Sequence, residues 1–157
     1  MTTVLVPEGA RGRGRAAPAR VTMPNVRQET FTSTATTRGI RVDVEARFAD
    51  EQRQPKPAWL FQYEVAITNE SPDMVRLLSR HWVIEHGDEH VEEVRGPGVV
   101  GARPYLVPGE SFRYTSWCPL RSPFGMMRGS YVMEVPGGKK FEVEIAPFTL
   151  SQPVTLH

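Results

Sequence analysis

The feature that most constrains the fold is the glycine-rich segment Gly96-Pro97-Gly98-Val99-Val100-Gly101, together with the two prolines that follow it. Its spacing is that of GxGxxG, the phosphate-binding motif of dinucleotide enzymes, which requires a preceding strand and a helix that opens at the third glycine. Pro104 and Pro108 are incompatible with that helix, because each lacks a backbone N–H and biases the preceding residue towards extended geometry. Residues 112–117 then alternate with the period of a strand. The segment is therefore predicted to be a loop between two strands, and a Rossmann-type domain is excluded.

The same two-residue alternation recurs along most of the chain. Residues 40–48 and 59–68 show it clearly, and the second segment, the longest and most apolar, is expected at the centre of a sheet. Residues 74–86 are ambiguous, because Ser71-Pro72 could cap a short helix, but the alternation in their second half favours strands. Seven or eight strands, separated by regular turn signals, predict an all-β fold: an antiparallel β-sandwich of the immunoglobulin or fibronectin type III kind.

Bulk composition fits one ordinary domain. The chain has 157 residues, of which 39% are hydrophobic and 24% charged, as in soluble globular proteins. Its single cysteine, Cys118, excludes an internal disulfide and agrees with a reducing compartment. No apolar run is long enough for a membrane span, and the N-terminus lacks a signal peptide. We therefore expect a cytoplasmic protein that does not associate with membranes.

The N-terminal segment differs from the rest. Residues 1–29, rich in Arg, Gly, Pro and Ala, are predicted to be a disordered tail, and residues 30–157 the domain. The whole chain has a net charge of +1; residues 1–38 hold six arginines and two glutamates, a net of +4, which leaves −3 for the remainder. A mildly acidic body is not expected to bind nucleic acid. The arginines of the tail could bind RNA phosphates unspecifically or simply be solvated, and translation could instead start at Met23.

Several motifs together resemble the ApaG family. They are the strand at 57–69, Arg80-His81-Trp82, the glycine-rich segment, Arg103-Pro104, the run Leu106-x-Pro-Gly-Glu-x-Phe-x-Tyr-x-Ser and Met127-x-Gly-x-Tyr. The resemblance covers residues 30–153 and implies a fibronectin-III-like sandwich without catalytic residues. It also implies a genetic link to cobalt or magnesium efflux in bacteria and, in larger proteins, a partner-binding role. The long arginine-containing tail departs from the family pattern.

The glycine-rich segment is a candidate anion site. Successive N–H groups in glycine-permitted geometry can surround a pyrophosphate, and two flanking arginines could add charge-assisted contacts. The alternative is that the glycines only permit a sharp loop, and Pro97 removes one donor. The candidate residues for binding pyrophosphate or a (di)nucleotide are Arg95, Gly96, Gly98, Val99, Val100, Gly101 and Arg103.

A second candidate is a surface for a protein partner. Four large side chains on the proline-rich connection do not fit the pattern of inward-facing strand residues: Trp117, Phe124, Met126 and Met127. Exposed aromatic and methionine side chains favour protein contacts. The alternative is that this connection covers an open end of the sandwich.

Metal binding and catalysis are not expected. A two-residue turn at Gly87-Asp88 would place His86 and His90 on opposite faces of their hairpin and pair His90 with Glu85. Cys118 has no neighbouring histidine to activate it, so an inert thiol is expected. We therefore predict no cofactor, no metal and no enzymatic activity. The preferred hypothesis is a protein-interaction module, with an unidentified partner and a homodimer as an open option. The alternative is a module that binds a phosphate-containing small ligand.

Overall fold

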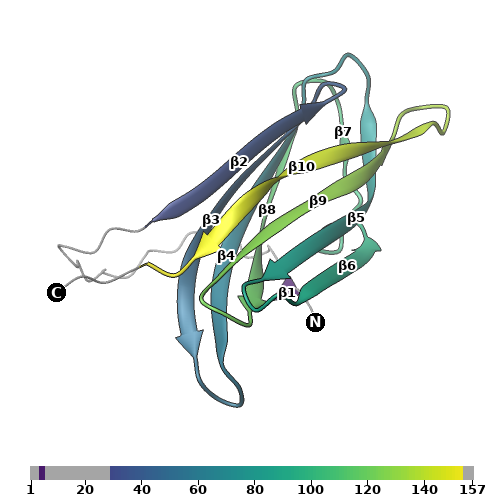
Figure 1. Cartoon of the computed structure of the whole chain (residues 1–157). Coiled ribbons are helices and arrows are strands. Elements are labelled where there is room, and N and C mark those ends of the chain that lie inside the picture. The colour runs from purple at the N-terminus through teal and green to yellow at the C-terminus, as the bar shows by residue number, and fades with distance from the viewer. Residues whose placement is uncertain (1–3, 6–28, 154–157) are drawn as a thin grey trace, which may run out of the picture.

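The computed structural model describes residues 4–5 and 29–153. Ten strands form two antiparallel sheets in this part of the chain, and no helix is present there (Figure 1). The predicted all-β sandwich is confirmed: eight strands have seven or more residues, and two short strands have two residues each. No helix that could cross a bilayer occurs in the described ranges.

The first sheet, sheet A, has the strand order β1-β8-β4-β3-β2. Its members are β1 (Val4–Leu5), β2 (Thr30–Thr37), β3 (Ile40–Gln52), β4 (Ala58–Asn69) and β8 (Ser111–Leu120). The prediction that the segment 59–68 lies at the centre of a sheet is confirmed, although β3, with 13 residues, is one residue longer than β4. Strand β1 falls within the predicted tail and pairs with β8; residues 6–28 lie outside the described residues, so the division at residue 29 stays a prediction.

The second sheet, sheet B, has the order β10-β9-β5-β6. Its members are β5 (Val75–His86), β6 (Val91–Pro97), β9 (Phe124–Glu134) and β10 (Lys140–Ser151), and the short β7 (Tyr105–Leu106) also pairs with β5. The ambiguous segment 74–86 is thus a strand, as favoured. At one margin the two sheets are joined by side chains of β2: Ser33 Oγ donates to the Ala146 carbonyl (2.9 Å), and Glu144 N–H donates to Thr37 Oγ1 (3.1 Å).

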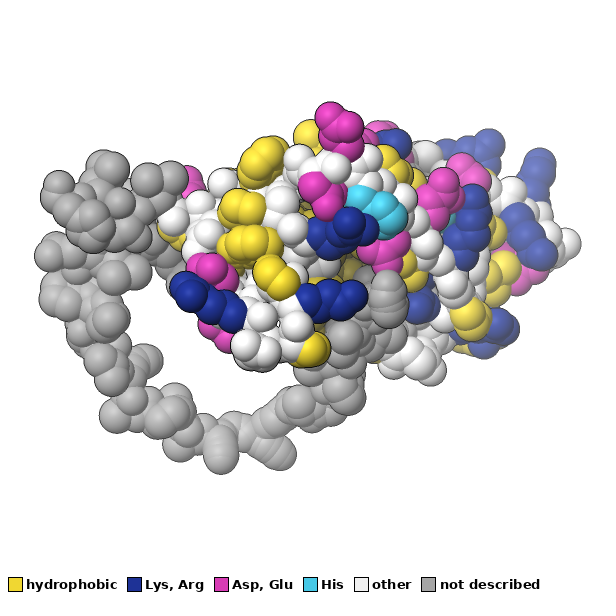
Figure 2. All heavy atoms as spheres, turned by 60° about the horizontal axis from the view of Figure 1, so that its bottom comes forward, with side chains coloured by type: hydrophobic (Ala, Val, Ile, Leu, Met, Phe, Trp, Pro, Cys, Tyr) yellow, Lys and Arg dark blue, Asp and Glu magenta, His cyan; other side chains and the backbone are white. Residues whose placement is uncertain are grey.

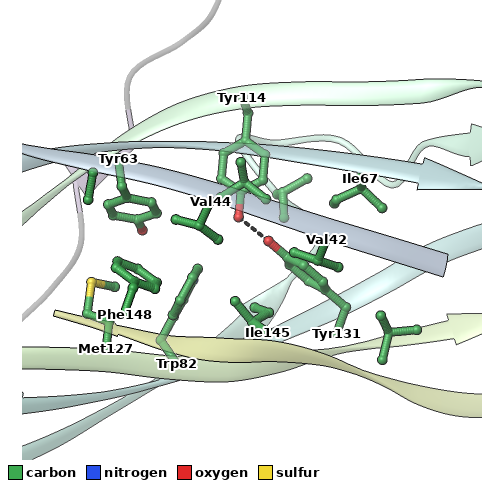
Figure 3. Close-up of a cluster of buried hydrophobic side chains, with 14 of the residues drawn as sticks. Val42, Val44, Tyr63, Ile67, Trp82, Tyr114, Met127, Tyr131, Ile145 and Phe148 are labelled. Carbon is green, nitrogen blue, oxygen red and sulfur yellow. Dashed lines mark hydrogen bonds between the residues drawn. The ribbon is translucent and has the colours of Figure 1, made fainter. Parts of the chain in front are cut away.

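The core lies between the sheets, where every second residue of the long strands is buried. Tyr63, Trp82 and Phe148 form an aromatic group whose centroids are 5.3 to 6.3 Å apart (Figure 3). Tyr114 from sheet A and Tyr131 from sheet B point towards each other, and their hydroxyls form a hydrogen bond of 2.5 Å. Burial raises the pKa of both phenols, so this pair stays neutral and links the sheets through the core.

Cys118 is part of the same core. Its side chain is fully buried, and burial raises the pKa of the thiol to about 12. The thiol is therefore buried, and a protonated sulfur without solvent access is a poor nucleophile.

Candidate functional site

The glycine-rich segment is an excursion from an edge strand. Strands β6 and β7 lie end to end along the same edge of β5. Gly98 N–H donates to the Leu78 carbonyl (2.8 Å) and Leu77 N–H donates to the Pro104 carbonyl (3.0 Å), so the ladder along β5 continues on both sides of the loop. Only the residues between these two bonds leave the edge. The loop is thus a local detour between strands, as predicted.

The tip of this detour is a tight turn that points apolar side chains inward. Val99 and Ala102 exchange both backbone hydrogen bonds, each 2.8 Å long, and the residues between them have positive φ: 41° at Val100 and 79° at Gly101. Two successive positive φ angles are typical of a type I′ turn. Val99 is fully buried, and Val100 packs against the same core. The turn therefore closes one side of the core rather than forming an open cradle.

Two further glycines are required by close contacts. Gly98 has a φ of 61°, and a Cβ on it would lie 2.3 Å from the Ala102 carbonyl oxygen. A Cβ on Gly96 would lie 3.0 Å from Nη2 of Arg80, whose guanidinium lies against this glycine. Nη1 of Arg80 donates to the carbonyls of Pro97 (3.0 Å) and Gly98 (2.9 Å). The glycines thus have a packing role that does not require a ligand.

The groups predicted to bind an anion are only partly available. The N–H groups of Gly98, Val99 and Ala102 are used within the protein, whereas those of Val100 and Gly101 have no hydrogen-bond partner among the described residues. The first flanking arginine, Arg95, bonds to Glu93 on the outer face of sheet B (3.2 Å). The second, Arg103, is exposed, and its carbonyl accepts a bond from Arg76 Nε (3.1 Å). Anion binding by this loop stays a prediction.

The structure separates the four residues predicted to form a partner surface. Met127 is fully buried in the core, because it belongs to the inward-facing set of β9. Trp117 is half-buried, and strand alternation places it on the outer face of sheet A. Phe124 and Met126 lie on the outer face of sheet B, so only these two are brought together. The predicted connection is short, because β8 continues to Leu120 and β9 begins at Phe124, which leaves residues 121–123 between them.

Strand β8 continues through Pro119 to Leu120, because this proline interrupts no hydrogen bond to β4. Pro119 pairs with Leu60 of β4. The bond from Asn69 N–H to the Glu110 carbonyl (2.9 Å) sets the alternation of the ladder, so the nitrogen of Pro119 points away from β4. Among the described residues β1 pairs with positions 116 and 117 of β8, and proline at an outward-facing position costs the β4–β8 ladder no hydrogen bond.

A hydrophobic patch surrounds Phe124. Its side chain is 56% exposed, as is that of Val91, and the two lie at the same end of sheet B. Val91 pairs with Glu85, which pairs in turn with Met126, so these three residues form one row across the outer face. We call Val91, Phe124 and Met126 the Phe124 patch. Sequence reasoning missed Val91, although its position directly after the β5–β6 turn was a signal. Figure 2 shows hydrophobic side chains gathered among charged ones at the end of the sandwich that carries this hairpin and the β3–β4 loop.

Phe124 is held in place by its surroundings. Ser122 Oγ donates to the Phe124 carbonyl (2.8 Å) and accepts from its N–H (3.3 Å). Gly87 lies against the ring: a Cβ on that glycine would be 2.9 Å from Phe124 Cε2 and 2.3 Å from Ser122 Oγ. An exposed aromatic ring on a rigid base loses little conformational freedom when it binds.

The neighbouring hairpin differs from its prediction. Its loop has three residues, 87–89, rather than two, because Glu89 has a positive φ of 75° and shifts the register by one residue. His86 and His90 therefore lie opposite each other, with ring centroids 5.3 Å apart, and Glu85 pairs with Val91 and bonds to Arg128 instead of His90. The predicted separation of the two histidines and the Glu85–His90 pair are both wrong.

The hairpin is tied to the β8–β9 connection through His86 and Asp88. The backbone N–H of Arg121 donates to His86 Nδ1 (3.0 Å), so Nε2 carries the proton and donates to Glu92 (3.1 Å). His90 N–H donates to Asp88 (3.0 Å), and this bond, together with the nearby Arg121 guanidinium, lowers the pKa of Asp88. Within the described residues, no group of three or more His, Cys, Asp or Glu side chains could hold a metal ion.

Comparison with known proteins agrees with this architecture. Residues 49–135 match the family model of the ApaG domain. The protein ApaG of Methylorubrum populi is 52% identical over 120 residues, which cover 76% of this chain and 92% of that protein. The protein ApaG of Bordetella pertussis is 49% identical over 119 residues, which cover 75% of this chain and 91% of that protein.

Solved structures show the same fold. A crystal structure named for the ApaA protein of Bordetella pertussis has a TM-score of 0.67 and 46% identity, and the match covers 74% of this chain and 95% of that one. An X-ray structure of a structural-genomics target has a TM-score of 0.71 and 38% identity, covering 76% of this chain and 91% of that one.

The two packed antiparallel sheets, with a glycine-rich detour on the edge of one, define a β-sandwich domain of the fibronectin type III class. With the family model matching more than half of the chain and relatives near 50% identity, the chain belongs to the ApaG family.

Proposed function

We propose that this ApaG-family sandwich is a non-enzymatic protein-interaction module and that the Phe124 patch is its contact surface. The observation that carries the proposal is the Phe124 side chain, which is 56% exposed, while Ser122 bonds to its backbone and Gly87 lies against its ring. Aromatic side chains that fill a partner's pocket from a rigid base contribute disproportionately to binding energy.

Charged side chains lie within and beside the patch and would give the contact its orientation. Glu85, in the same row as Val91 and Met126, forms an ion pair with Arg128. Asp88 and Arg121 form a second ion pair (3.1 Å) beside the Phe124 support. Protein–protein interfaces combine apolar contacts with polar and charged groups. We place this contact in the cytoplasm, in a pathway linked to cobalt or magnesium homeostasis, a link that rests on the family resemblance alone.

The test compares two exposed aromatic residues at opposite ends of β5. Phe124 and Tyr105 are both 56% exposed, but Tyr105 lies on β7, beside the beginning of β5. Phe124→Ala and Tyr105→Ala are each used as bait in extracts of the native organism, after amide NMR spectra have shown that both remain folded. A partner retained by wild type and by Tyr105→Ala but lost with Phe124→Ala supports the patch. A partner that both variants retain, or that both lose, would refute it.

A second candidate function is binding of a phosphate-containing small ligand by the glycine loop. It is favoured by the exposed Arg103 and by the N–H groups of Val100 and Gly101, which have no partner within the part of the chain that the structure describes. Against it, three other amides of the loop already have partners. An amide NMR titration with pyrophosphate and with diadenosine tetraphosphate, with and without Mg²⁺, tests it. Saturable shifts confined to residues 95–103 support the ligand site, and no shifts at millimolar ligand contradict it.

A further inference from the structure

Strand β6 is the outer strand of sheet B, opposite the margin where β10 meets β2 (Figure 1). It spans Val91–Pro97 and pairs with β5 on one side only within the part of the chain that is described. An edge strand presents backbone N–H and C=O groups that can pair with another chain.

The hydrogen bonds at its two ends determine which of these groups face outward. His86 N–H donates to the His90 carbonyl (2.8 Å), and Gly98 N–H donates to the Leu78 carbonyl (2.8 Å). Because an antiparallel ladder alternates, the even-numbered residues of β6 bond to β5. The backbone N–H and C=O groups of Val91, Glu93 and Arg95 therefore point away from the sheet. Pro97, which lacks an N–H, also has its nitrogen on this outer side and marks the end of the edge.

The charges on β6 favour one antiparallel register between the β6 strands of two copies. Strand alternation puts Glu93 and Arg95 on the outer face, and Glu93 has a lowered pKa because His81 and then Arg95 bond to it. If two copies pair antiparallel with Glu93 opposite Glu93, or Arg95 opposite Arg95, like charges meet and oppose association. Centred on Val94, the pairing instead places each Glu93 opposite the partner subunit's Arg95, with all outward N–H and C=O groups of both residues satisfied.

We infer that the β6 edge is a docking site for a second copy of this chain, in the antiparallel register centred on Val94. This register forms two Glu93–Arg95 pairs between the subunits and joins the two copies of sheet B into one continuous sheet. Val94, half-buried against the core, contacts the partner's Val94 on the inner side of the sheet. Gly96, against which the Arg80 guanidinium lies, is opposite the partner's Glu92.

Arg80 lies at the C-terminal end of β6 and bonds to its backbone. Its guanidinium passes beside Gly96 and donates to the carbonyls of Pro97 and Gly98. The Pro97 carbonyl keeps a second lone pair, which can accept from the partner subunit's Val91 N–H. Beyond Pro97 the glycine-rich detour leaves the edge, so the pairing stops there and cannot propagate into a fibre.

The test exchanges the two charges of the edge. Sedimentation equilibrium of the full chain, over the micromolar to millimolar range, is expected to show a dimer for wild type. Glu93→Arg and Arg95→Glu each create like-charge pairs twice in the dimer, so each is expected to weaken association about tenfold or more. The double variant Glu93→Arg/Arg95→Glu restores both opposite-charge pairs and is expected to dimerise again.

The double variant also separates a lost interface from a damaged fold. Glu142→Arg makes the same change of charge on β10, far from the edge, and is expected to dimerise like wild type. A monomeric wild type over the whole concentration range would overturn the inference. So would a double variant, folded by amide NMR, that stays as weakly associated as the single variants. The Phe124→Ala variant lies outside the paired residues and is expected to dimerise, so failure of the partner surface and failure of the dimer are distinguishable.

Discussion

The substitution Asn69→Ala should destabilise the domain more than any other single change at a chain reversal. Asn69 ends β4 and is fully buried. Its Nδ2 donates to the carbonyls of Leu106 (2.9 Å) and Asp73 (2.8 Å), while its Oδ1 accepts from the N–H of Ser71 (2.9 Å) and from Ser71 Oγ (2.7 Å). One amide therefore holds together the end of β4, the turn that follows it and the strand β7.

The expected magnitude follows from which partners water can reach. Alanine removes one of the two donors to the buried Leu106 carbonyl, which still pairs with Val75 in the β5–β7 ladder, so this loss costs about 1 to 1.5 kcal/mol. The bonds to Ser71 and Asp73 lie near solvent, so their loss costs about 0.5 kcal/mol each after water replaces them. We expect the free energy of unfolding to fall by about 3 kcal/mol, a large fraction of the roughly 5 to 15 kcal/mol that stabilises a typical domain.

Urea unfolding followed by tryptophan fluorescence measures this loss. Ser71→Ala is the matched control: it removes only the hydroxyl of a half-buried side chain and should cost less than about 1 kcal/mol. Asn69→Asp keeps the acceptor but turns an oxygen towards two carbonyls, so it should be at least as harmful as alanine. The reasoning is refuted if Asn69→Asp unfolds at the wild-type urea midpoint, or if Asn69→Ala loses no more than Ser71→Ala.

Three further changes test the core and the glycine-rich detour. Tyr131→Phe leaves the buried Tyr114 hydroxyl unpaired and should cost about 1 to 2 kcal/mol in urea unfolding, whereas the double Tyr→Phe variant should lose less than the sum of the two single losses. Burial raises the pKa of Cys118 to about 12. The neutral thiol therefore stabilises the folded state below the pKa of the unfolded thiol, and this stabilisation is lost as the pH rises above about 9. The decline in Tm between neutral and alkaline pH should be shallower in Cys118→Ala. Gly96→Ala should cost about 1 kcal/mol by displacing the Arg80 guanidinium, and much less in an Arg80→Ala background; equal losses in the two backgrounds would contradict the contact.

Hydrophobic alternation was sufficient to predict the fold because most strands have one buried face. Residues 40–46 follow a strict buried and half-buried pattern in β3, and the same pattern identifies β4. A shift of one residue would move every core side chain to the outside, so the pattern strongly specifies the register. The Pro108-Gly109 dipeptide of the family motif forms a tight turn, in which Glu110 N–H donates to the Val107 carbonyl (3.0 Å) and Gly109 has a φ of 90°.

Irregularities of one residue were not predictable in the same way. Glu89 adopts the positive φ that turns usually assign to glycine, whereas Gly87-Asp88 predicts a two-residue turn, so the predicted positions of His86 and His90 are wrong. A bulge between Leu77 and Ser79 changes which residues of β5 face inward, and it is this change that turns Arg80 towards the core. Neither the positive φ of Glu89 nor this bulge occurs at a residue type that would predict it.

The glycine-rich segment shows why a motif must be judged by where its amides point. A phosphate loop directs successive N–H groups outward to a ligand, and its glycines allow that approach. Here the amide of Gly98 is directed to β5, those of Val99 and Ala102 close a turn on each other, and Gly96 makes room for a guanidinium. Three glycines at the same spacing therefore serve three separate local requirements of an edge strand. The glycine spacing by itself is compatible with a Rossmann fold, and it is Pro104 and Pro108 that exclude the required helix. The role of each glycine depends on neighbours that are distant in the sequence.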